Sequence, residues 1–409
     1  MGRLLLLVLC LISAMACSLS TRAAALCEHG AGGLRRGLEE QSMRGRLLGD
    51  DTAGGAAVSV YWSPRVLHSV ANFTIGTPPQ PVSGFIDLSG ELVWTQCAAC
   101  GGCFEQELPL FNTSASSTYR AEPCGSTLCK SIPTSSCSGY GECGYVAPSK
   151  LGDTFGIAGT DTVAIGTAKG RLAFGCVEES KIDAMWGPSG FVGLGRTPWS
   201  LVAQTNATAF SYCLAPHGPG KSSKLFLGSS AKLAGGKSNS TPFVNASGSP
   251  DDGSDPDYKV QLEGIKAGDV AILSPPNGTT VVLDTFSPFS FLVDGAHQVL
   301  KKVAAAALGA PAANPLRPFD LCIENATVSN APELVLTFQG AAALTVPPSS
   351  YLLDVGNGTV CLSILSSARL NLTDGVSILG SLQQENVHFL FDLDKKTLSF
   401  QPANCSSLS

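Results

Sequence analysis

Charged side chains are scarce in this sequence: Asp, Glu, Lys and Arg make up 14% of its 409 residues. That is too little charge for a long coiled coil or a disordered chain, whereas the apolar residues, at 44%, can build a large buried core. The 26 basic residues form no block and are outnumbered by 32 acidic ones. We therefore expect no nucleic acid partner.

The sequence also lacks a hydrophobic run long enough to span a bilayer, which needs about 20 residues. Its strongly apolar run, residues 4–12, follows Arg3 and precedes a group of alanines at 23–25. This pattern predicts a secretory signal peptide over residues 1–25, with an uncleaved anchor as the alternative. The polar stretch 401–409 offers no membrane tail, so we expect no membrane anchor.

Histidine is rare, with five residues, and none has the spacing of a metal-dependent protease motif. Three other signatures fail at a required glycine. Ala215 interrupts a phosphate loop, Pro198 a dinucleotide fingerprint and Phe191 a nucleophile elbow. We therefore expect neither a metal nor another cofactor.

Cysteine, by contrast, is abundant, with 15 residues. Three of them precede residue 28, and the remaining even number predicts six disulfide bridges in an oxidising compartment. The spacing of Cys97, Cys100 and Cys103 also fits a metal or redox site, but secretion favours disulfides. The predicted disulfide cysteines are Cys97, Cys100, Cys103, Cys124, Cys129, Cys137, Cys143, Cys176, Cys213, Cys322, Cys361 and Cys405.

Ten Asn-X-Ser/Thr sequons predict a glycosylated surface if the chain enters the secretory pathway. Asn404 is a doubtful acceptor because Cys405 follows it. Chance is the alternative explanation, since a chain rich in Ser and Thr generates some sequons anyway. The nine candidate sites are Asn72, Asn112, Asn206, Asn239, Asn245, Asn277, Asn325, Asn357 and Asn371.

Abundant Gly (45) and Pro (25) favour a loop-rich β protein over a helix bundle. One helix is expected after Asp294, which would cap it, and the polar stretch 237–258 predicts a linker between two halves. Residues 26–65 form a candidate pro-segment or a disordered leader, 66–240 the N-terminal β half and 241–409 the C-terminal β half. The predicted strands include residues 71–76, 85–87, 92–95, 171–176, 224–227, 279–283, 334–338, 376–379, 387–393 and 397–400.

A short pattern occurs once in each half: apolar residues, then an Asp, then small hydroxyl or glycine residues. The two acidic residues are Asp87 and Asp284. An Asp at the end of an apolar strand is unfavourable to bury unless it is hydrogen-bonded. Two of them meeting between the halves would share one proton, because like charges in contact cannot both ionise cheaply. One carboxylate could then activate water while the other donates a hydrogen bond, which makes both residues catalytic candidates.

Specific motifs accompany this pattern. They are FTIGTPPQ at 73–80, LVWTQC at 92–97, FGC at 174–176, GFVGLGR at 190–196, FSYCL at 210–214, ILG at 378–380 and FDLDKKTLSF at 391–400. With the Cys-rich insert 97–143, they resemble pepsin-like (family A1) aspartic proteases of the plant nepenthesin-like branch over residues 70–405. The resemblance implies an all-β, bilobal pepsin-like acid protease fold with a few short helices. It also implies a monomer, with a peptide or protein substrate in the cleft between the lobes.

The resemblance implies roles for further residues. Thr285 and Ser287 would support the catalytic loop of Asp284 through their hydroxyls. A flap over the substrate would form around Leu151, Gly152, Asp153 and Thr154. The family's C-terminal lobe suggests a bridge between Cys322 and Cys361. Secretion would lead to the apoplast or cell wall, with the vacuole as another destination.

The catalytic loops nevertheless depart from the family pattern, Asp-Thr-Gly-Ser or Asp-Ser-Gly-Thr. In the first loop Leu88 removes a hydroxyl that would bond across the lobes, Ser89 replaces a Gly, and Gly90 removes a hydroxyl beside the carboxylate. In the second loop Phe286 replaces the Gly, and in the flap Leu151 stands where the family usually has Tyr. Losing donors aimed at the transition state costs about 10²–10³ in rate each.

Three hypotheses follow. The first is a secreted aspartic-type endopeptidase of atypical or reduced activity. The second is a catalytically inactive binding or inhibitor protein resembling plant xylanase inhibitors, which the altered loops favour. The third is a storage or wall protein that retains only the fold. Two retained acids favour the first, because a binding protein has no evident need for them.

Overall fold

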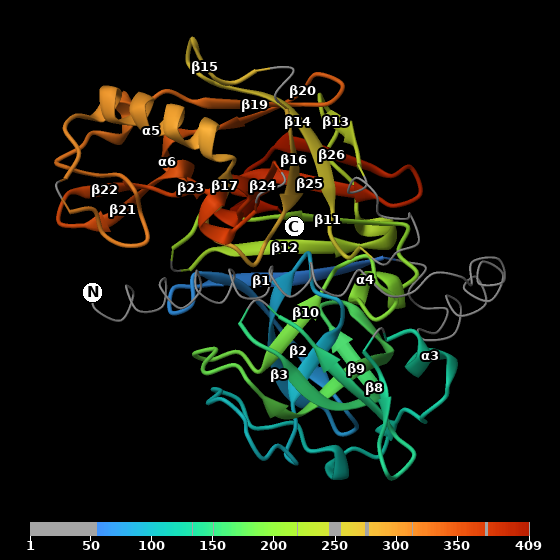
Figure 1. Ribbon diagram of the computed structural model, residues 1–409. Helices are drawn as coiled ribbons and strands as arrows, with labels where there is room; N and C mark the ends of the chain where they lie inside the picture. The colour runs from blue at the N-terminus through green and yellow to red at the C-terminus, as the bar shows by residue number, and fades with distance from the viewer. Residues whose placement is uncertain are drawn as a thin grey trace.

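The computed structural model describes residues 55–132, 134–149, 151–218, 220–244, 255–274, 278–312, 314–372 and 375–408. The predicted signal peptide and the sequons at Asn245 and Asn277 lie outside these ranges. Within them, no helix has the length and apolar character that crossing a membrane requires. Figure 1 shows two lobes built mostly of strands, the N-terminal one in blue and green and the C-terminal one in yellow to red. The prediction of an all-β, bilobal fold is confirmed.

One large sheet is shared by both halves of the sequence. Its order is β13-β26-β25-β11-β12-β1-β2-β3-β10-β4-β9-β8-β7-β6, with β5 beside β8. Strands β25 and β26 come late in the sequence yet belong to this sheet, where β25 lies beside β11 and β26 beside β25 (Figure 1). The bounds are β1 Ala56–Ser63, β2 His68–Ile75, β3 Gln80–Asp87, β4 Val93–Gln96, β5 Arg120–Ala121, β6 Ser136–Cys137, β7 Cys143–Ala147, β8 Thr154–Ile165, β9 Ala168–Ser180, β10 Gly190–Gly193, β11 Ala209–Cys213, β12 Ser222–Leu227, β13 Asn239–Pro242, β25 Val387–Asp392 and β26 Thr397–Pro402.

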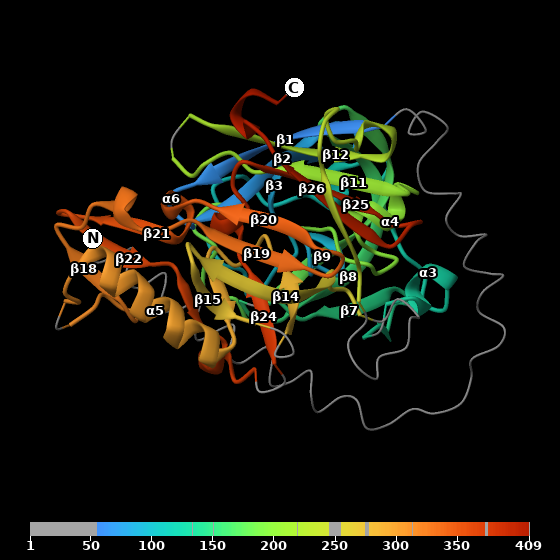
Figure 2. The ribbon, with the colours of Figure 1, turned by 90° about the horizontal axis from the view of Figure 1, so that it is seen from above.

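The C-terminal lobe has two further sheets. The larger has the order β20-β19-β14-β16-β24-β17-β23, with β15 beside β14, and the smaller has the order β18-β22-β21. Figure 2 shows the long helix α5 lying along the outer side of this lobe. The bounds are β14 Lys259–Ala267, β15 Val270–Leu273, β16 Thr279–Leu283, β17 Ser290–Leu292, β18 Cys322–Glu324, β19 Leu334–Phe338, β20 Ala342–Val346, β21 Leu352–Gly356, β22 Thr359–Leu362, β23 Ile364–Ser366 and β24 Val376–Leu379.

The strands are of two kinds, buried on one face or buried along their whole length. In β19 the buried residues are Leu334, Leu336 and Phe338, so one face packs on the core and the other does not. In β4 and β10 every residue is buried. Strands of the second kind run through the lobe interior, where a side chain at a strand end can be held away from water.

Helix α5 (Asp294–Leu308) buries Ala296, Leu300 and Ala304, which lie on one face at helical spacing. The expectation that Asp294 caps it is wrong. Val293 is the capping residue and makes no side-chain cap bond, while the Asp294 carboxylate accepts a hydrogen bond from Ser366 Oγ at 2.8 Å. The other α-helices within the described ranges are one turn long: α3 Thr127–Lys130, α4 Leu201–Gln204 and α6 Pro348–Tyr351.

Strand β1 lies inside the span 26–65, which the sequence assigned to a candidate pro-segment. It pairs with β12 on one side and β2 on the other, and Val58 and Val60 are buried in the core. Removing it would break the shared sheet in its interior. A pro-segment that is cut away would therefore have to end before Ala56.

Twelve cysteines form six disulfides, so the prediction of six bridges is confirmed. Three tie the Cys-rich insert internally, one joins it to β9, one lies within the C-terminal lobe, and one closes the shared sheet. The pairs are Cys100–Cys103, Cys124–Cys137, Cys129–Cys143, Cys97–Cys176, Cys322–Cys361 and Cys213–Cys405. The last joins the end of β11 to the segment after β26.

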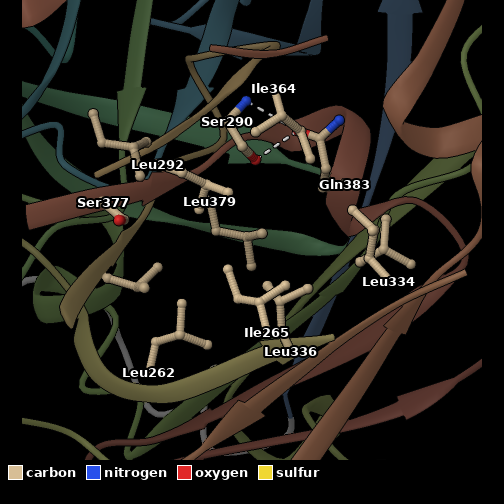
Figure 3. A pocket seen from close by; sticks show the side chains of 13 residues that line it. Leu262, Ile265, Ser290, Leu292, Leu334, Leu336, Ile364, Ser377, Leu379 and Gln383 are labelled. Atoms are coloured by element: carbon tan, nitrogen blue, oxygen red, sulfur yellow. Dashed lines mark hydrogen bonds between the residues drawn. The ribbon is translucent and has the colours of Figure 1, made fainter. Parts of the chain in front are cut away.

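The core of the C-terminal lobe contains a small cavity of about 20 Å³ (Figure 3). Its walls are mainly leucine and isoleucine side chains such as Leu262, Leu336 and Leu379. Gln383 lies at its edge, but its amide oxygen accepts hydrogen bonds from both the backbone N–H and the hydroxyl of Ser290, at 3.0 and 2.6 Å. The cavity therefore belongs to the packing of the lobe and offers no unsatisfied polar group from Gln383 to a ligand.

Removing the Cys213–Cys405 bridge is expected to destabilise the protein most among the six. The bridge closes a loop of 192 residues, and the unfolded chain gains the most entropy when so long a loop is opened. The double variant Cys213→Ala/Cys405→Ala should lose about 5 kcal/mol of unfolding free energy in denaturant titration. The control Cys100→Ala/Cys103→Ala opens a separation of three residues and should lose only about 1–2 kcal/mol. Equal losses would contradict this expectation.

A histidine–glutamate pair adds a pH-dependent contact beside the shared sheet. His217 Nδ1 lies 3.0 Å from Glu385 Oε1, and the His217 backbone N–H donates to the same oxygen at 2.7 Å. The Glu385 side chain is 6% exposed and that of His217 is 35% exposed. Hydrogen bonding to Glu385 raises the pKa of His217 above its ordinary value of 6.5, although burial opposes the shift.

A raised folded-state pKa predicts stabilisation in acid. The contribution is complete below about pH 6.5 and disappears as the pH rises through the raised value. We expect His217→Ala to lower the unfolding free energy more at about pH 5 than at about pH 8, as measured by denaturant titration at each pH. Glu385→Gln should remove the same pH dependence. An identical loss at both pH values would show that the pair does not titrate in this way.

Candidate active site

Asp87 is the last residue of β3, which runs parallel to β10 with Asp87 opposite Gly193. Its side chain is buried, and its Oδ1 accepts a hydrogen bond from the Ser89 backbone N–H at 3.0 Å. The next strand, β4, is antiparallel to β10. The carboxylate therefore stands at the end of a buried strand, held by the loop that follows it.

Asp284 occupies the equivalent place in the other lobe. It follows β16, which runs parallel to β24, and β24 is antiparallel to β17. Its side chain is 1% exposed, and its Oδ1 accepts hydrogen bonds from the backbone N–H groups of Phe286 and Ser287 at 2.8 and 3.0 Å. The order β16-β24-β17 thus repeats β3-β10-β4, and each repeat presents one buried acid.

Thr285 joins the two acidic loops. Its Oγ1 donates a hydrogen bond to the carbonyl oxygen of Ile86 at 2.9 Å and accepts one from the backbone N–H of Leu88 at 3.2 Å. Ile86 and Leu88 flank Asp87, and Thr285 follows Asp284. One hydroxyl therefore binds both sides of the first acid from a residue adjacent to the second.

The first loop cannot make the equivalent side-chain bond to the second loop. The residue after Asp87 is Leu88, which carries no hydroxyl. Leu88 is instead completely buried in the main hydrophobic core. Leu194, which follows β10, packs in the same core and donates its backbone N–H to the Asp87 carbonyl oxygen at 2.8 Å. The first loop is thus held by packing and backbone bonds where the second uses a hydroxyl.

Gly90 shows why the first loop differs from the family pattern. A side chain at this position would place its Cβ 2.8 Å from Gly193 Cα and 3.2 Å from Asp87 Cβ, which is too close for any residue but glycine without a shift of backbone. Ser89 takes the preceding place, where its backbone N–H reaches the carboxylate. The family order Gly-Ser is therefore reversed to Ser89-Gly90 because the backbone leaves room only for glycine at position 90.

Ser287 differs from its expected arrangement in detail. Its hydroxyl donates to the carbonyl oxygen of Phe289 at 2.7 Å, while its backbone N–H donates to Asp284. The loop is further held by the Ser381 backbone N–H, which donates to the Ser287 carbonyl oxygen at 2.8 Å. Ser287 thus contacts the acid through its backbone and shapes the turn through its side chain.

The predicted flap residues lie on the β7–β8 hairpin. Ala147 pairs with Thr154 at the end of the two strands, next to the turn. Gly152 lies at the turn with φ +143°. The Lys181 backbone N–H donates to the carbonyl oxygen of Asp153 at 2.9 Å. Leu151 packs against the second hydrophobic cluster of the N-terminal lobe, which we call the aromatic cluster because it contains Phe85, Trp94, Phe104, Tyr145, Phe191 and Trp199.

Two supporting residues were not predicted from the sequence. Gln384 Nε2 donates to the carbonyl oxygen of Asp284 at 2.9 Å, and Tyr212 donates its hydroxyl to Gln384 Oε1. Burial, together with the charge of Asp284, raises the pKa of Tyr212 well above 10, so the phenol stays protonated. Tyr212 lies within the FSYCL motif at 210–214, but its pairing with Gln384, more than 170 residues further along, leaves no local signal in the sequence.

Two carboxylates are therefore the reactive groups that this site presents. Among the described residues, no three or more His, Cys, Asp or Glu side chains are grouped so that they could hold a metal ion. A pair of acids held by backbone donors can serve as general acid and general base when one of them carries a proton.

Replacing Thr285 by Val should loosen the junction between the two loops. The variant keeps the β-branched shape but leaves the buried Ile86 carbonyl and Leu88 N–H without this partner, which should lower the unfolding free energy by about 2–4 kcal/mol. Thr345→Val, at an exposed position of β20, is the matched control and should change it by less than about 0.5 kcal/mol. Denaturant titration of both variants checks this, and a Thr285→Val loss no larger than the control would contradict it.

Comparisons with known proteins agree with this arrangement. The family model for "Xylanase inhibitor N-terminal" matches residues 70–229, and that for "Xylanase inhibitor C-terminal" matches residues 257–402. The chain is similar to aspartic proteinase nepenthesin-1 of Nepenthes gracilis, with 32% identity over 91% of this chain and 86% of the relative. It is also similar to aspartyl protease 37 of Oryza sativa subsp. japonica, with 29% identity over 94% and 92% of the two chains.

Solved structures share the fold. Basic 7S globulin from soybean superposes with a TM-score of 0.69 and 20% identity, covering 87% of this chain and 98% of that one. Conglutin gamma from lupine seeds superposes with a TM-score of 0.67 and 19% identity, covering 87% and 95%. The extent of the sequence matches and the repeated acid-bearing strands lead to one conclusion: the chain belongs to the pepsin-like (A1) family of plant aspartic proteinases, in its nepenthesin-like branch.

Proposed function

We propose that this protein is a secreted aspartic-type endopeptidase in which Asp87 and Asp284 activate a water molecule for peptide hydrolysis. The observation that carries the proposal is the Thr285 hydroxyl, which binds the backbone on both sides of Asp87 from the residue next to Asp284. A junction between the loops that carry the two buried acids supports their acting together on one water molecule.

The chemistry follows from the proximity of like charges. Two adjacent carboxyl groups hold one proton between them in acid, an arrangement for which aspartic proteases are the reference case. The ionised carboxylate takes a proton from water as the water attacks the peptide carbonyl carbon, and the protonated one donates a hydrogen bond to the carbonyl oxygen. Backbone donors at Ser89, Phe286 and Ser287 orient the carboxylates for these roles.

The substrate in this proposal is a peptide or an unfolded segment of a protein, lying extended between the lobes beneath the β7–β8 hairpin. The protein acts as a monomer, since both acids come from one chain. The rate is below that of relatives with intact loops, because Leu88 offers no hydroxyl where the second loop has Thr285.

Secretion is supported by the disulfides and by the position of the sequons. Six of the sequon asparagines are exposed and could carry a glycan: Asn72, Asn112, Asn206, Asn325, Asn357 and Asn371. Asn239 is a poor acceptor, because its Nδ2, the atom that would be modified, donates a hydrogen bond to the Ala343 carbonyl oxygen at 3.0 Å. The proposed destination is the apoplast or cell wall, or the vacuole.

Replacing either acid should abolish hydrolysis. We expect Asp87→Asn and Asp284→Asn each to lower kcat/KM on a denatured protein substrate by at least about 10²–10⁴-fold, because each removes one half of the acid–base pair. Asp269→Asn, at an exposed turn, is the matched control and should retain full activity. Activity of the native protein should be greatest in acid, as the aspartic-protease mechanism requires.

Two outcomes would contradict the proposal. One is hydrolysis that survives both substitutions, which would indicate a contaminating protease. The other is a folded native protein that cleaves no substrate at any acidic pH, which would leave the fold serving as a binding or inhibitor protein.

A further inference from the structure

Phe286 belongs to the C-terminal lobe but packs inside the N-terminal lobe. It lies two residues after Asp284, and its side chain is 1% exposed. All the other residues of the aromatic cluster, to which it belongs, come from the N-terminal half, between Val66 and Trp199. A single side chain from the second catalytic loop therefore crosses to the opposite lobe.

The contacts place the ring close to the first acid. Its centroid lies 4.3 Å from that of His68 in an edge-on arrangement, 5.3 Å from Phe191 and 5.6 Å from Phe85. Phe85 is two residues before Asp87 on β3, so both side chains leave the same face of the strand. Phe191 pairs with Phe85 on β10, just as Gly193 pairs with Asp87.

A bound peptide would need this same space. A substrate extended across Asp87 and Asp284 advances about 3.3 Å per residue, and Phe85 lies two residues, about 6.6 Å, before Asp87 along β3. We expect a large side chain next to the cleaved bond to be directed at Phe85 and Phe191, the paired rings of β3 and β10 two residues before Asp87 and Gly193. The hairpin that would cover it contributes Tyr145 and Leu151 to the same aromatic cluster. The ring of Phe286 already packs among these elements as a buried member of the aromatic cluster.

We propose that Phe286 is a specificity-determining residue that occupies the apolar subsite beside Asp87, so that the cleft accepts only small residues next to the cleaved bond. This inference rests on the proposed endopeptidase function for its substrate and on the ring contacts for its geometry. Replacing the ring by a methyl group opens a space suited to a benzyl or isobutyl side chain.

The test measures binding separately from hydrolysis. The probes are two extended peptides in which a hydroxyethylene group replaces the cleavable bond and the flanking residues are both Ala or both Phe. With the native protein, the Ala analogue should bind more tightly than the Phe analogue. Phe286→Ala should bind the Phe analogue about 10–100-fold more tightly than the native protein does, the ratio expected for burying one large apolar side chain. Its affinity for the Ala analogue should change by less than about threefold.

Two further variants protect the test against a folding defect. Phe286→Leu removes less volume and should shift the preference in the same direction by a few fold, so it serves if Phe286→Ala does not fold. Phe338→Ala is the matched control for a lost ring, because Phe338 is fully buried on β19 of the C-terminal lobe, away from the aromatic cluster. It should leave both affinities unchanged. An unchanged affinity for the Phe analogue in folded Phe286 variants, or an equal gain in Phe338→Ala, would overturn the inference.

Cleavable versions of both peptides separate this inference from the proposed function. If Phe286→Ala gains affinity for the Phe analogue but neither protein hydrolyses a peptide, the proposed function fails and the filled subsite stands. If the native protein cleaves the Phe-Phe peptide as fast as Phe286→Ala does, the endopeptidase function stands and the filled subsite is refuted.

Discussion

The hydroxyl of Thr285 is the contact on which the arrangement of this site depends. It is completely surrounded by protein, and its two hydrogen bonds reach the backbone immediately before and after Asp87. Packing between the lobes could tolerate small slides, but two hydrogen bonds from one hydroxyl to adjacent peptide groups tolerate them less, because both weaken when the geometry changes. This side chain links the two acidic loops directly, and every chemical role assigned to the two acids presupposes that link.

The two catalytic loops show how similar strand arrangements can be stabilised by different means. In the first, Leu88 contributes its side chain to the core and Gly90 allows close approach to β10. In the second, Thr285 and Ser287 contribute hydroxyls, and Phe286 contributes its side chain to the opposite lobe. The first loop gains apolar burial in the main hydrophobic core, whereas the second gains contacts with the N-terminal lobe.

Much of the fold could be predicted from the sequence, because strand patterns are local. The runs at 279–283, 334–338 and 376–379 match β16, β19 and β24 residue for residue. Gln384 and Tyr212, which support Asp284, could not be predicted, since they lie far from it and from each other in sequence. That Phe286 would enter the N-terminal lobe depends on a pocket formed by β2, β3 and β10. The replacement of the family's glycine by Phe286 shows that the second loop differs from the family pattern, but it does not show where the Phe286 side chain packs.

The shared sheet has a consequence for how the protein is made. Strand β11 needs β25 beside it, yet about 170 residues separate them, so the amino-terminal lobe leaves the ribosome with an incomplete edge. That open edge can pair with a neighbouring nascent chain until β25 arrives. We expect folding to finish only after synthesis ends, slowly and with a requirement for chaperones, as such non-local pairing implies.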